Sequence, residues 1–323
     1  ARLRGDPGAL ARLRRAYRRR HGGAELEPGA EFVAPLSDAE HARIGRWYNR
    51  PWHVPATGVF AFGGAAAASP PLLNPAVDWA AAVAAFAASA PWSHAVVDGA
   101  LSDRGLAAVR RLFLESTIWH EVKPPNAVKT RVDDGMHAGL VLRLAAELER
   151  ALPALYGGRT TKMAWAYKKG IANTSFGVDV HHDGNSFLTA VFFPSQDGAN
   201  LEEGKTGGML LFHKVATQDD FKAHYGAGGE GGAAVIDDKY QYHRMYNDRN
   251  KCWVRDAVPN TTVPQVPNRL LLFRSYLFHT SDRIHFREDY GNERWVLVFT
   301  STLEKQDAGL NMGLMRFDRA DVK

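Results

Sequence analysis

The chain has almost no cysteine, since Cys252 is the only one among its 323 residues. A single thiol cannot form an intrachain disulfide, which excludes a disulfide-stapled scaffold. Long apolar runs are missing as well. The longest, the Ala-rich stretch of residues 79–92, is too short to span a bilayer and is typical of a soluble helix. The sequence therefore predicts a soluble protein that is held together by a packed core.

Net charge is absent outside the first fifty residues. Residues 1–50 contain 11 Arg and no Lys against 6 acidic residues, whereas the other 273 residues contain 29 basic and 29 acidic side chains. A nucleic-acid or anionic-membrane surface on the main body therefore gets no support, and no nucleic-acid partner is expected. Within residues 9–23, Leu10, Leu13 and Tyr17 recur at helical spacing and Arg fills the other faces. This pattern predicts a short basic helix, which would suit an acidic protein partner.

Two other interpretations of the Arg-rich start are open. The helix can simply be solvated, or the segment can be the remainder of a processed transit region, because transit peptides are rich in Arg and poor in acidic residues. The expected location is intracellular, either in the cytoplasm or in an organelle.

The sequence divides into two parts near residue 90. Residues 1–90 combine the basic helix with an extended wrap rich in Ala, Pro and Gly, and residues 91–323 carry the regular patterns of a domain. A long insertion at residues 214–268 interrupts the second part and is Gly-rich, then aromatic and basic. An insertion of this length is typical of a lid or a partner surface.

Helical patterns precede strand patterns in the second part. A strand is predicted over residues 95–97, a helix from an N-cap at Ser102 or Asp103, and a second helix over residues 138–158. Seven or eight short β-rich runs then follow, separated by turn residues. This order predicts an α+β, mainly β fold: a double-stranded β-helix of the jelly-roll or cupin-like type, with helices buttressing one sheet and an N-terminal helical extension.

The candidate chemistry begins in the stretch GVDVHHDGNSFLTAVFFP, residues 177–194. Residues two apart in a strand point to the same face, so His181 and Asp183 share a face and His182 points away. An imidazole and a carboxylate on one face are two of the three ligands of a 2-His-1-carboxylate iron site. The spacing H-x-D or H-x-E is expected about once by chance here, and it occurs once. A polar turn is the alternative, so the pair needs support from elsewhere.

Two later strands supply that support. His279 can complete the three ligands, with His285 as the alternative. Arg294 opens the last strong strand and offers a rigid fork for a carboxylate, such as the far end of an oxo acid. Arg283 and Arg287 are rivals for this role because they lie between His279 and Arg294 in the sequence.

The stretch from about Trp92 to Thr302 resembles the Fe(II)/2-oxoglutarate-dependent oxygenase superfamily. The likeness is closest to its prolyl-hydroxylase-like branch and to oxygenase-like domains attached to tetratricopeptide repeats. It is carried by the phrases VVDGALSDRGLAAVRRLFLESTIWHEV, MAWAYK, GANLEEGKTGGMLLF and NRLLLFRSYLFHTSDRIHFREDYGNERW. The resemblance implies that the family motif H-x-D…H…R corresponds to the catalytic residues His181, Asp183, His279 and Arg294, of which the first three would bind the metal.

The same resemblance implies a reaction. The expected enzyme is a 2-oxoglutarate-dependent dioxygenase that hydroxylates a protein side chain, an amino acid or a small metabolite and releases succinate and CO2. Its expected cofactors are Fe(II) and the co-substrate 2-oxoglutarate, with ascorbate as an optional reductant. Arg294 and Tyr167 are the residues expected to bind the co-substrate. A catalytically silent subunit that acts as an assembly module, and a cupin-type enzyme that uses no oxo acid, are the alternatives.

Overall fold

The chain separates into two units, residues 1–50 and residues 51–323. Arg15 and Arg18, which are helical and exposed, are the described residues of the first unit, so the rest of the predicted basic helix lies outside the described residues. So do residues 216–253 of the predicted insertion. In the second unit, the computed structural model describes residues 53–57, 69–123, 127–133, 135–136, 138–169, 180–183, 186–215, 254–287 and 289–302.

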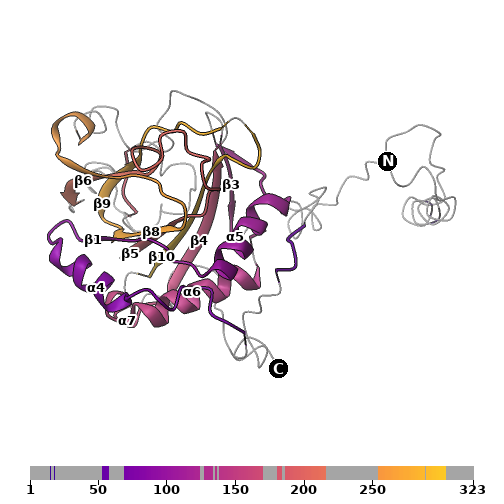
Figure 1. Cartoon of the computed structure of the whole chain (residues 1–323), viewed down its shortest axis with the longest axis horizontal. Coiled ribbons are helices and arrows are strands. Elements are labelled where there is room, and N and C mark those ends of the chain that lie inside the picture. Colours follow the sequence, from indigo (N-terminus) through magenta and orange to yellow (C-terminus); the bar gives the residue numbers. More distant parts are fainter. Residues whose placement is uncertain are drawn as a thin grey trace. The chain divides into compact units, whose positions relative to one another are not determined.

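Two antiparallel sheets organise the second unit (Figure 1). The large sheet has seven strands in the order β1-β8-β5-β10-β4-β3-β2, and the small sheet has three in the order β7-β6-β9. The strands are β1 His94–Val97, β2 Glu121–Lys123, β3 Ala127–Arg131, β4 Thr161–Lys169, β5 Leu188–Phe193, β6 Met209–Val215, β7 Asn260–Val263, β8 Arg269–Arg274, β9 Leu277–Ser281 and β10 Arg294–Ser301.

The chain alternates between the two sheets from β4 onward. Between β4 and β5, an antiparallel bridge joins His181 to His279 of β9, so residues 180–183 extend the small sheet beyond β9. The chain then passes from β5 in the large sheet to β6 and β7 in the small one, to β8 in the large, β9 in the small and β10 in the large. This alternation of antiparallel strands confirms the predicted double-stranded β-helix.

Helices cover one face of the large sheet (Figure 1). Alternate residues of the strands point toward these helices, and both sets of apolar side chains form one core. The helices therefore buttress one sheet, as the sequence predicts. Burial of their apolar stripes, at about 25 cal/mol per Å² of apolar surface, holds this layer on the sheet. The helices of this layer are α4 Trp79–Ala88, α5 Asp103–Glu115, α6 Gly139–Ala151 and α7 Pro153–Tyr156. None of the described helices is long and apolar enough to cross a membrane.

Helix ends follow the sequence in one case and depart from it in another. The Ser102 hydroxyl accepts the Gly105 N–H at 3.1 Å, which confirms the predicted N-cap of α5. The prediction of one continuous helix over residues 138–158 is wrong, because α6 ends at Ala151 and a single turn, α7, follows. Pro153 causes the break, since proline disfavours the helical conformation of the residue before it and lacks an N–H to donate.

Segments that no sequence pattern distinguished also contribute to the unit. The hairpin β2–β3 extends the large sheet beyond β4, and β7 lies within the predicted insertion. Ahead of residue 90, the backbone N–H groups of Leu72 and Leu73 donate to the Glu147 carboxylate of α6 at 2.7 and 2.9 Å. Phe86 of α4 is buried in the same core. The residues just before β1 thus pack with the barrel.

A second core lies between the two sheets and defines the inner face of the large sheet. Three partly buried aromatic residues, Trp92, Trp165 and Tyr167, border it. Because side chains alternate along β10, Arg294 points to the same inner face as Val296 and Val298. The buried members of this core are Val191, Phe193, Met209, Leu211, Val263, Leu271, Phe273, Leu277, Val296 and Val298.

Candidate metal centre and a buried arginine

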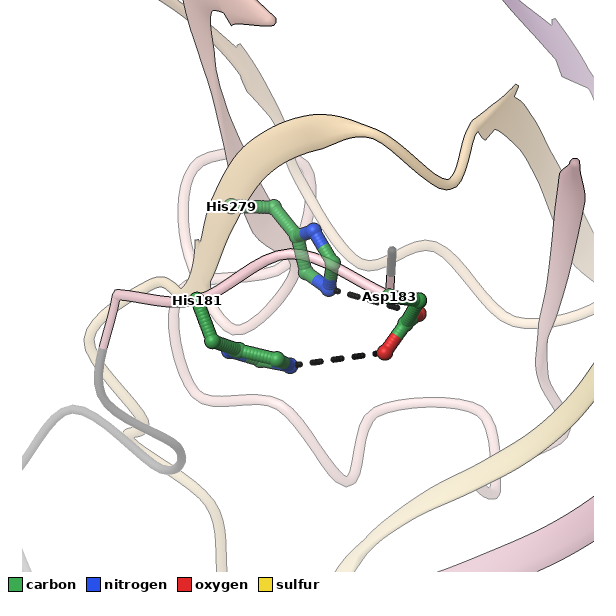
Figure 2. Close-up of side chains that lie close together, drawn as sticks. All are labelled: His181, Asp183 and His279. Atoms are coloured by element: carbon green, nitrogen blue, oxygen red, sulfur yellow. Dashed lines mark ion pairs between the residues drawn. The ribbon is translucent and has the colours of Figure 1, made fainter. Parts of the chain in front are cut away.

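Three side chains converge at one edge of the small sheet, as Figure 2 shows. His181, Asp183 and His279 each present a ligand atom, and these atoms all lie within 4.8 Å of one another. Asp183 Oδ1 is 4.0 Å from His181 Nε2, and Asp183 Oδ2 is 3.8 Å from His279 Nε2. These distances are too long for hydrogen bonds. The two histidine nitrogens therefore face the carboxylate across a gap.

Backbone pairing brings these ligands together. The His181 N–H donates to the His279 carbonyl at 2.9 Å, and the His279 N–H donates to the His181 carbonyl at 2.7 Å. The two imidazole rings consequently lie side by side, with centroids 4.2 Å apart. Asp183 follows two residues after His181 on the same side. His182 points elsewhere and contacts the Phe278 ring edge-on at 5.1 Å, as strand alternation predicts.

His279 has the protonation state that a metal ligand needs. Burial lowers its pKa to about 4, so the ring is neutral at physiological pH. Its Nδ1 lies 2.9 Å from the Leu277 carbonyl, which can only accept, so Nδ1 carries the proton. The lone pair is then on Nε2, the atom that faces Asp183. A neutral imidazole oriented by a carbonyl in this way is typical of metal-binding histidines.

Neighbouring hydroxyl groups orient the Asp183 carboxylate. Thr189 Oγ1 of β5 donates to Asp183 Oδ2 at 3.2 Å and lies 2.8 Å from Ser275 Oγ. The Asp183 N–H donates to the Ser275 carbonyl at 2.7 Å. Hydrogen bonds thus hold the Asp183 backbone and one of its carboxylate oxygens. Lone pairs on both oxygens remain for a cation.

The donor set fits a divalent transition metal. Ligands at right angles around a metal, each about 2.1 Å from it, lie about 3 Å apart, so the ligand atoms, which lie within 4.8 Å of one another, need to approach by about one to two ångströms. Two imidazoles and one carboxylate suit Fe(II) with open coordination positions. Among the described residues, this is the one group of three or more His, Cys, Asp or Glu side chains whose ligand atoms converge.

Arg294 is buried on the inner face of β10, with 4% of its surface exposed. Its Nε donates to the Gly207 carbonyl at 2.5 Å and its Nη2 to the Gly208 carbonyl at 3.0 Å. Burial lowers its pKa to about 10, which still leaves it charged at neutral pH, and the negative charge of Asp282 opposes the shift. No acceptor in the described part of the chain is bonded to Nη1. The edge formed by Nη1 and Nη2 is therefore available to a carboxylate ligand.

The glycine pair before β6 makes this anchoring of Arg294 feasible. A Cβ on Gly208 would lie 1.8 Å from the Val263 carbonyl oxygen, so no other residue fits there. Gly207 has a φ of +81°, in the left-handed region that other residues rarely adopt. The two glycines let this segment approach Val263 of β7 closely. The carbonyls of Gly207 and Gly208 are then within reach of the Arg294 guanidinium.

The rival residues lie outside the barrel interior. Arg283 is largely exposed and pairs with Glu202, and His285 Nδ1 is 3.5 Å from the same carboxylate. Arg287 donates to the Gly198 carbonyl at 2.8 Å from an exposed position. Of the three arginines considered for a carboxylate, Arg294 is the one that the fold buries on the inner face.

Tyr167 lies on the inner face of the large sheet, which faces the small sheet that carries the metal ligands. It packs against the core between the sheets, and its pKa is raised by burial and by the negative charges of Glu121 and Asp183. A hydroxyl with a raised pKa stays protonated and can donate a hydrogen bond to an anion.

The sequence pattern did not single out two charged residues near Arg294, Lys169 and Asp282. Lys169 is the last residue of β4 and pairs directly with Arg294. The Asp282 N–H donates to the Gly208 carbonyl just after β9. Lys169 had one available signal, because it stands two residues after Tyr167 and therefore shares its face of the strand. Asp282 follows the end of a strand, where alternation gives no direction.

Comparisons with known proteins found similar solved structures at low sequence identity. No family model matches the chain, and no curated protein does. Solved structures similar to it include a prolyl hydroxylase from Trichoplax adhaerens in complex with a hypoxia inducible factor oxygen degradation domain peptide fragment. That likeness has 11% identity and a TM-score of 0.45, and covers 72% of this chain and 93% of the other.

Two further structures are similar at the same level. One is the epimerase SnoN in complex with Fe3+, alpha ketoglutarate and nogalamycin RO, with 14% identity, a TM-score of 0.44, and coverage of 69% of this chain and 83% of that one. The other is an oxidoreductase of the 2OG-Fe(II) oxygenase family from Burkholderia pseudomallei, with 11% identity, a TM-score of 0.42, and coverage of 72% and 95%. The roles of individual residues are therefore taken from the geometry of this chain itself.

Proposed function

We propose that this chain is an Fe(II)- and 2-oxoglutarate-dependent oxygenase that hydroxylates a substrate and releases succinate and CO2. The observation that supports the proposal is the convergence of three potential metal ligands, together with a guanidinium buried on the inner face of the large sheet. His181, Asp183 and His279 would hold Fe(II). Arg294 would bind the carboxylate at the far end of the co-substrate.

The spacing along β6 suits a five-carbon diacid. Gly208, whose carbonyl holds Arg294, is three residues before Leu211, which pairs with His279. Three residues of extended strand span about 10 Å. An extended 2-oxoglutarate, together with the reach of the arginine side chain, fills a distance of this order. The keto-acid end would then lie at the metal and the other carboxylate at Arg294.

The residues of the chain prepare the site before any ligand arrives. The neutral His279 and the oriented Asp183 carboxylate present lone pairs to a cation. Arg294 is held by two backbone carbonyls and needs no reorganisation to receive a carboxylate. Tyr167 would donate a hydrogen bond to the co-substrate. Preorganised donors of this kind cost little entropy when a ligand binds.

The proposed reaction balances. 2-Oxoglutarate loses CO2 and takes up one oxygen atom of O2 to give succinate, and the second oxygen atom enters a C–H bond of the substrate as a hydroxyl group. The four electrons that reduce O2 come from the oxo acid and from the C–H bond, two from each. Bound Fe(II) would supply the place at which O2 and the oxo acid meet.

The test has a binding part and a turnover part. Fe(II)-loaded protein without O2 should bind 2-oxoglutarate in isothermal titration calorimetry, and admission of O2 should release succinate and CO2 in equal amounts. Asp183→Ala should abolish both, because the remaining two histidines make a poor metal site. If the metal-loaded wild-type protein binds no 2-oxoglutarate, the proposal is overturned. Co-substrate binding without succinate release would instead indicate a silent binding module.

A further inference from the structure

Gln265 is a buried amide that lies between the two sheets. It stands two residues after Val263 of β7, a member of the core between the sheets, and 1% of its surface is exposed. Its Nε2 donates to Ser195 Oγ at 2.6 Å. Because Ser195 follows β5 of the large sheet and Gln265 follows β7 of the small one, this hydrogen bond crosses the interior from one sheet to the other.

Two contacts place this amide beside Arg294. The Ser195 hydroxyl that accepts from Gln265 also accepts the Trp295 N–H at 2.8 Å, and Trp295 is the residue after Arg294. A Cβ on Gly208 would lie 2.8 Å from the Gln265 backbone nitrogen. The Gly208 carbonyl is one of the two that hold the guanidinium. Gln265 therefore adjoins both the backbone of Arg294 and the segment that anchors its side chain.

The Gln265 amide has one polar atom without a partner. Its Oε1 is buried and accepts no hydrogen bond from the described residues. Ser195 Oγ accepts two N–H groups, and within the same part of the chain its own proton has no acceptor. A half-turn of the amide resolves both deficits, because the hydroxyl then donates to Oε1 and still accepts the Trp295 N–H. The NH2 group of Gln265 then takes the place that lacks a partner.

A buried NH2 group beside a guanidinium suits a ligand that only accepts hydrogen bonds. The Arg294 edge formed by Nη1 and Nη2 points away from the two carbonyls that hold the side chain. An ionised carboxylate has about four lone pairs and no donor. It can therefore accept from the guanidinium fork and from an amide N–H at the same time.

We propose that Gln265 is a second binding residue for the far carboxylate of the oxo-acid co-substrate, to which it donates an amide N–H beside Arg294. The inference rests on the proposed function and adds a specificity-determining residue to it. The amide contributes a directional hydrogen bond to a charged group. Oxo acids that end in a methyl group, such as 2-oxopentanoate, leave the amide unpaired and are discriminated against.

Calorimetric titration of Fe(II)-loaded protein without O2 tests the role of Gln265. Gln265→Met should weaken 2-oxoglutarate binding about tenfold, because one hydrogen bond to a charged group is lost. 2-Oxopentanoate should bind weakly to both proteins, with the same affinity. Gln196→Met, the same change next to Ser195, is the matched control and should alter neither ligand's affinity. The metal content should be the same in all these proteins.

Gln265→Glu distinguishes a direct contact from a packing role. The variant keeps the shape of glutamine but places a negative charge beside the ligand. 2-Oxoglutarate should therefore bind about tenfold more weakly to Gln265→Glu than to Gln265→Met, because like charges repel. If Gln265 served packing alone, the variant that keeps its shape would bind more tightly than Gln265→Met. That order of affinities overturns the proposed role.

The outcomes separate this inference from the proposed function. A wild-type protein that binds no 2-oxoglutarate overturns the function itself. If the wild type binds it and Gln265→Met binds it equally tightly, or loses affinity for both oxo acids alike, only the role of Gln265 is overturned. If Gln265→Met fails to fold in a thermal melt, Gln265→Glu decides alone. A loss of 2-oxoglutarate affinity of about tenfold or more relative to the wild type then supports the role, and a smaller loss overturns it.

Discussion

Two consecutive lysines of β4 show how differently the two faces of the large sheet treat a buried charge. Lys168 faces the helices and Lys169 faces the barrel interior; both are almost fully buried, and burial lowers the pKa of each to about 8. Their neighbours differ. Lys168 Nζ lies 3.6 Å from the centroid of the Tyr290 ring and 5.0 and 5.7 Å from those of Trp119 and Trp295. Lys169 instead lies beside the cation Arg294.

The difference teaches that burial alone does not mark a functional charge. Aromatic ring faces attract an ammonium group, so the environment of Lys168 is complete without a ligand. Within the described residues its Nζ has no hydrogen-bond acceptor, which leaves the rings as its main contacts. Arg294, on the inner face, instead turns one edge of its guanidinium toward a possible carboxylate ligand while two backbone carbonyls hold it in place. The outer face is therefore expected to govern stability, and the inner face binding.

The largest expected effect concerns two neighbouring histidines at the edge of the small sheet, His181, which faces the other ligands, and His182, which points away. His181→Ala should lower Fe(II) affinity at least a hundredfold, because it removes one of three ligands. His182→Ala is the matched control and should retain the affinity within about threefold, since its ring contacts Phe278. Metal content measured by elemental analysis after dialysis distinguishes the two. Equal metal loss in both variants would contradict the assignment of the inner histidine.

Arg294→Met should have the next largest effect, on the co-substrate rather than the metal. We expect 2-oxoglutarate binding to weaken about a hundredfold, because the carboxylate loses a two-pronged charged contact. Metal content should stay unchanged, since Arg294 is not among the converging ligands. Activity that survives this change with full iron content would point to a metal enzyme that uses no oxo acid.

Lys168 should matter for stability and not for the co-substrate. Lys168→Ala should lower the free energy of unfolding by about 2–3 kcal/mol, because a buried aliphatic stem is lost and a cavity is left. Lys168→Met fills the same space without the cost of a buried charge and should change it by less than about 1 kcal/mol. Urea titration measures both. A large loss of 2-oxoglutarate affinity in Lys168→Met would contradict the expectation that the outer face of the large sheet governs stability and the inner face governs binding.

The smallest expected effect is a pH dependence of stability. The pKa of Lys168 is lowered in the folded state, so the unfolded chain binds more protons between about pH 8 and the usual lysine range near 10.5. Stability should therefore rise with pH over this window and be lowest, as far as this group is concerned, below pH 8. Paired urea titrations of the wild type and Lys168→Met, from pH 7.5 to 9.5, should show a steeper rise in the wild type. Parallel curves would count against a buried ammonium at this position.

The sequence predicts the fold well, together with the shared face of His181 and Asp183, because both depend on local alternation. Period-two patterns place His181 and Asp183 on one side of the chain, and the caps and stripes of α5 follow from neighbouring residues. The pairing of Lys169 with Arg294 depends instead on the register between β4 and β10, which are over 120 residues apart in the chain. The hairpin β2–β3 was missed because its strands are short, and Pro153 ended α6 within a strong helical pattern.

The reciprocal backbone bonds between His181 and His279 have a consequence for local opening. The N–H of each residue is shielded by the carbonyl of the other, and both side chains would grip the same ion. Fraying this edge of the small sheet would then require the ion to leave first. Deuterium uptake at these two amides should slow in proportion to metal occupancy. The exchange rates of these two amide protons therefore report how tightly the site binds its metal.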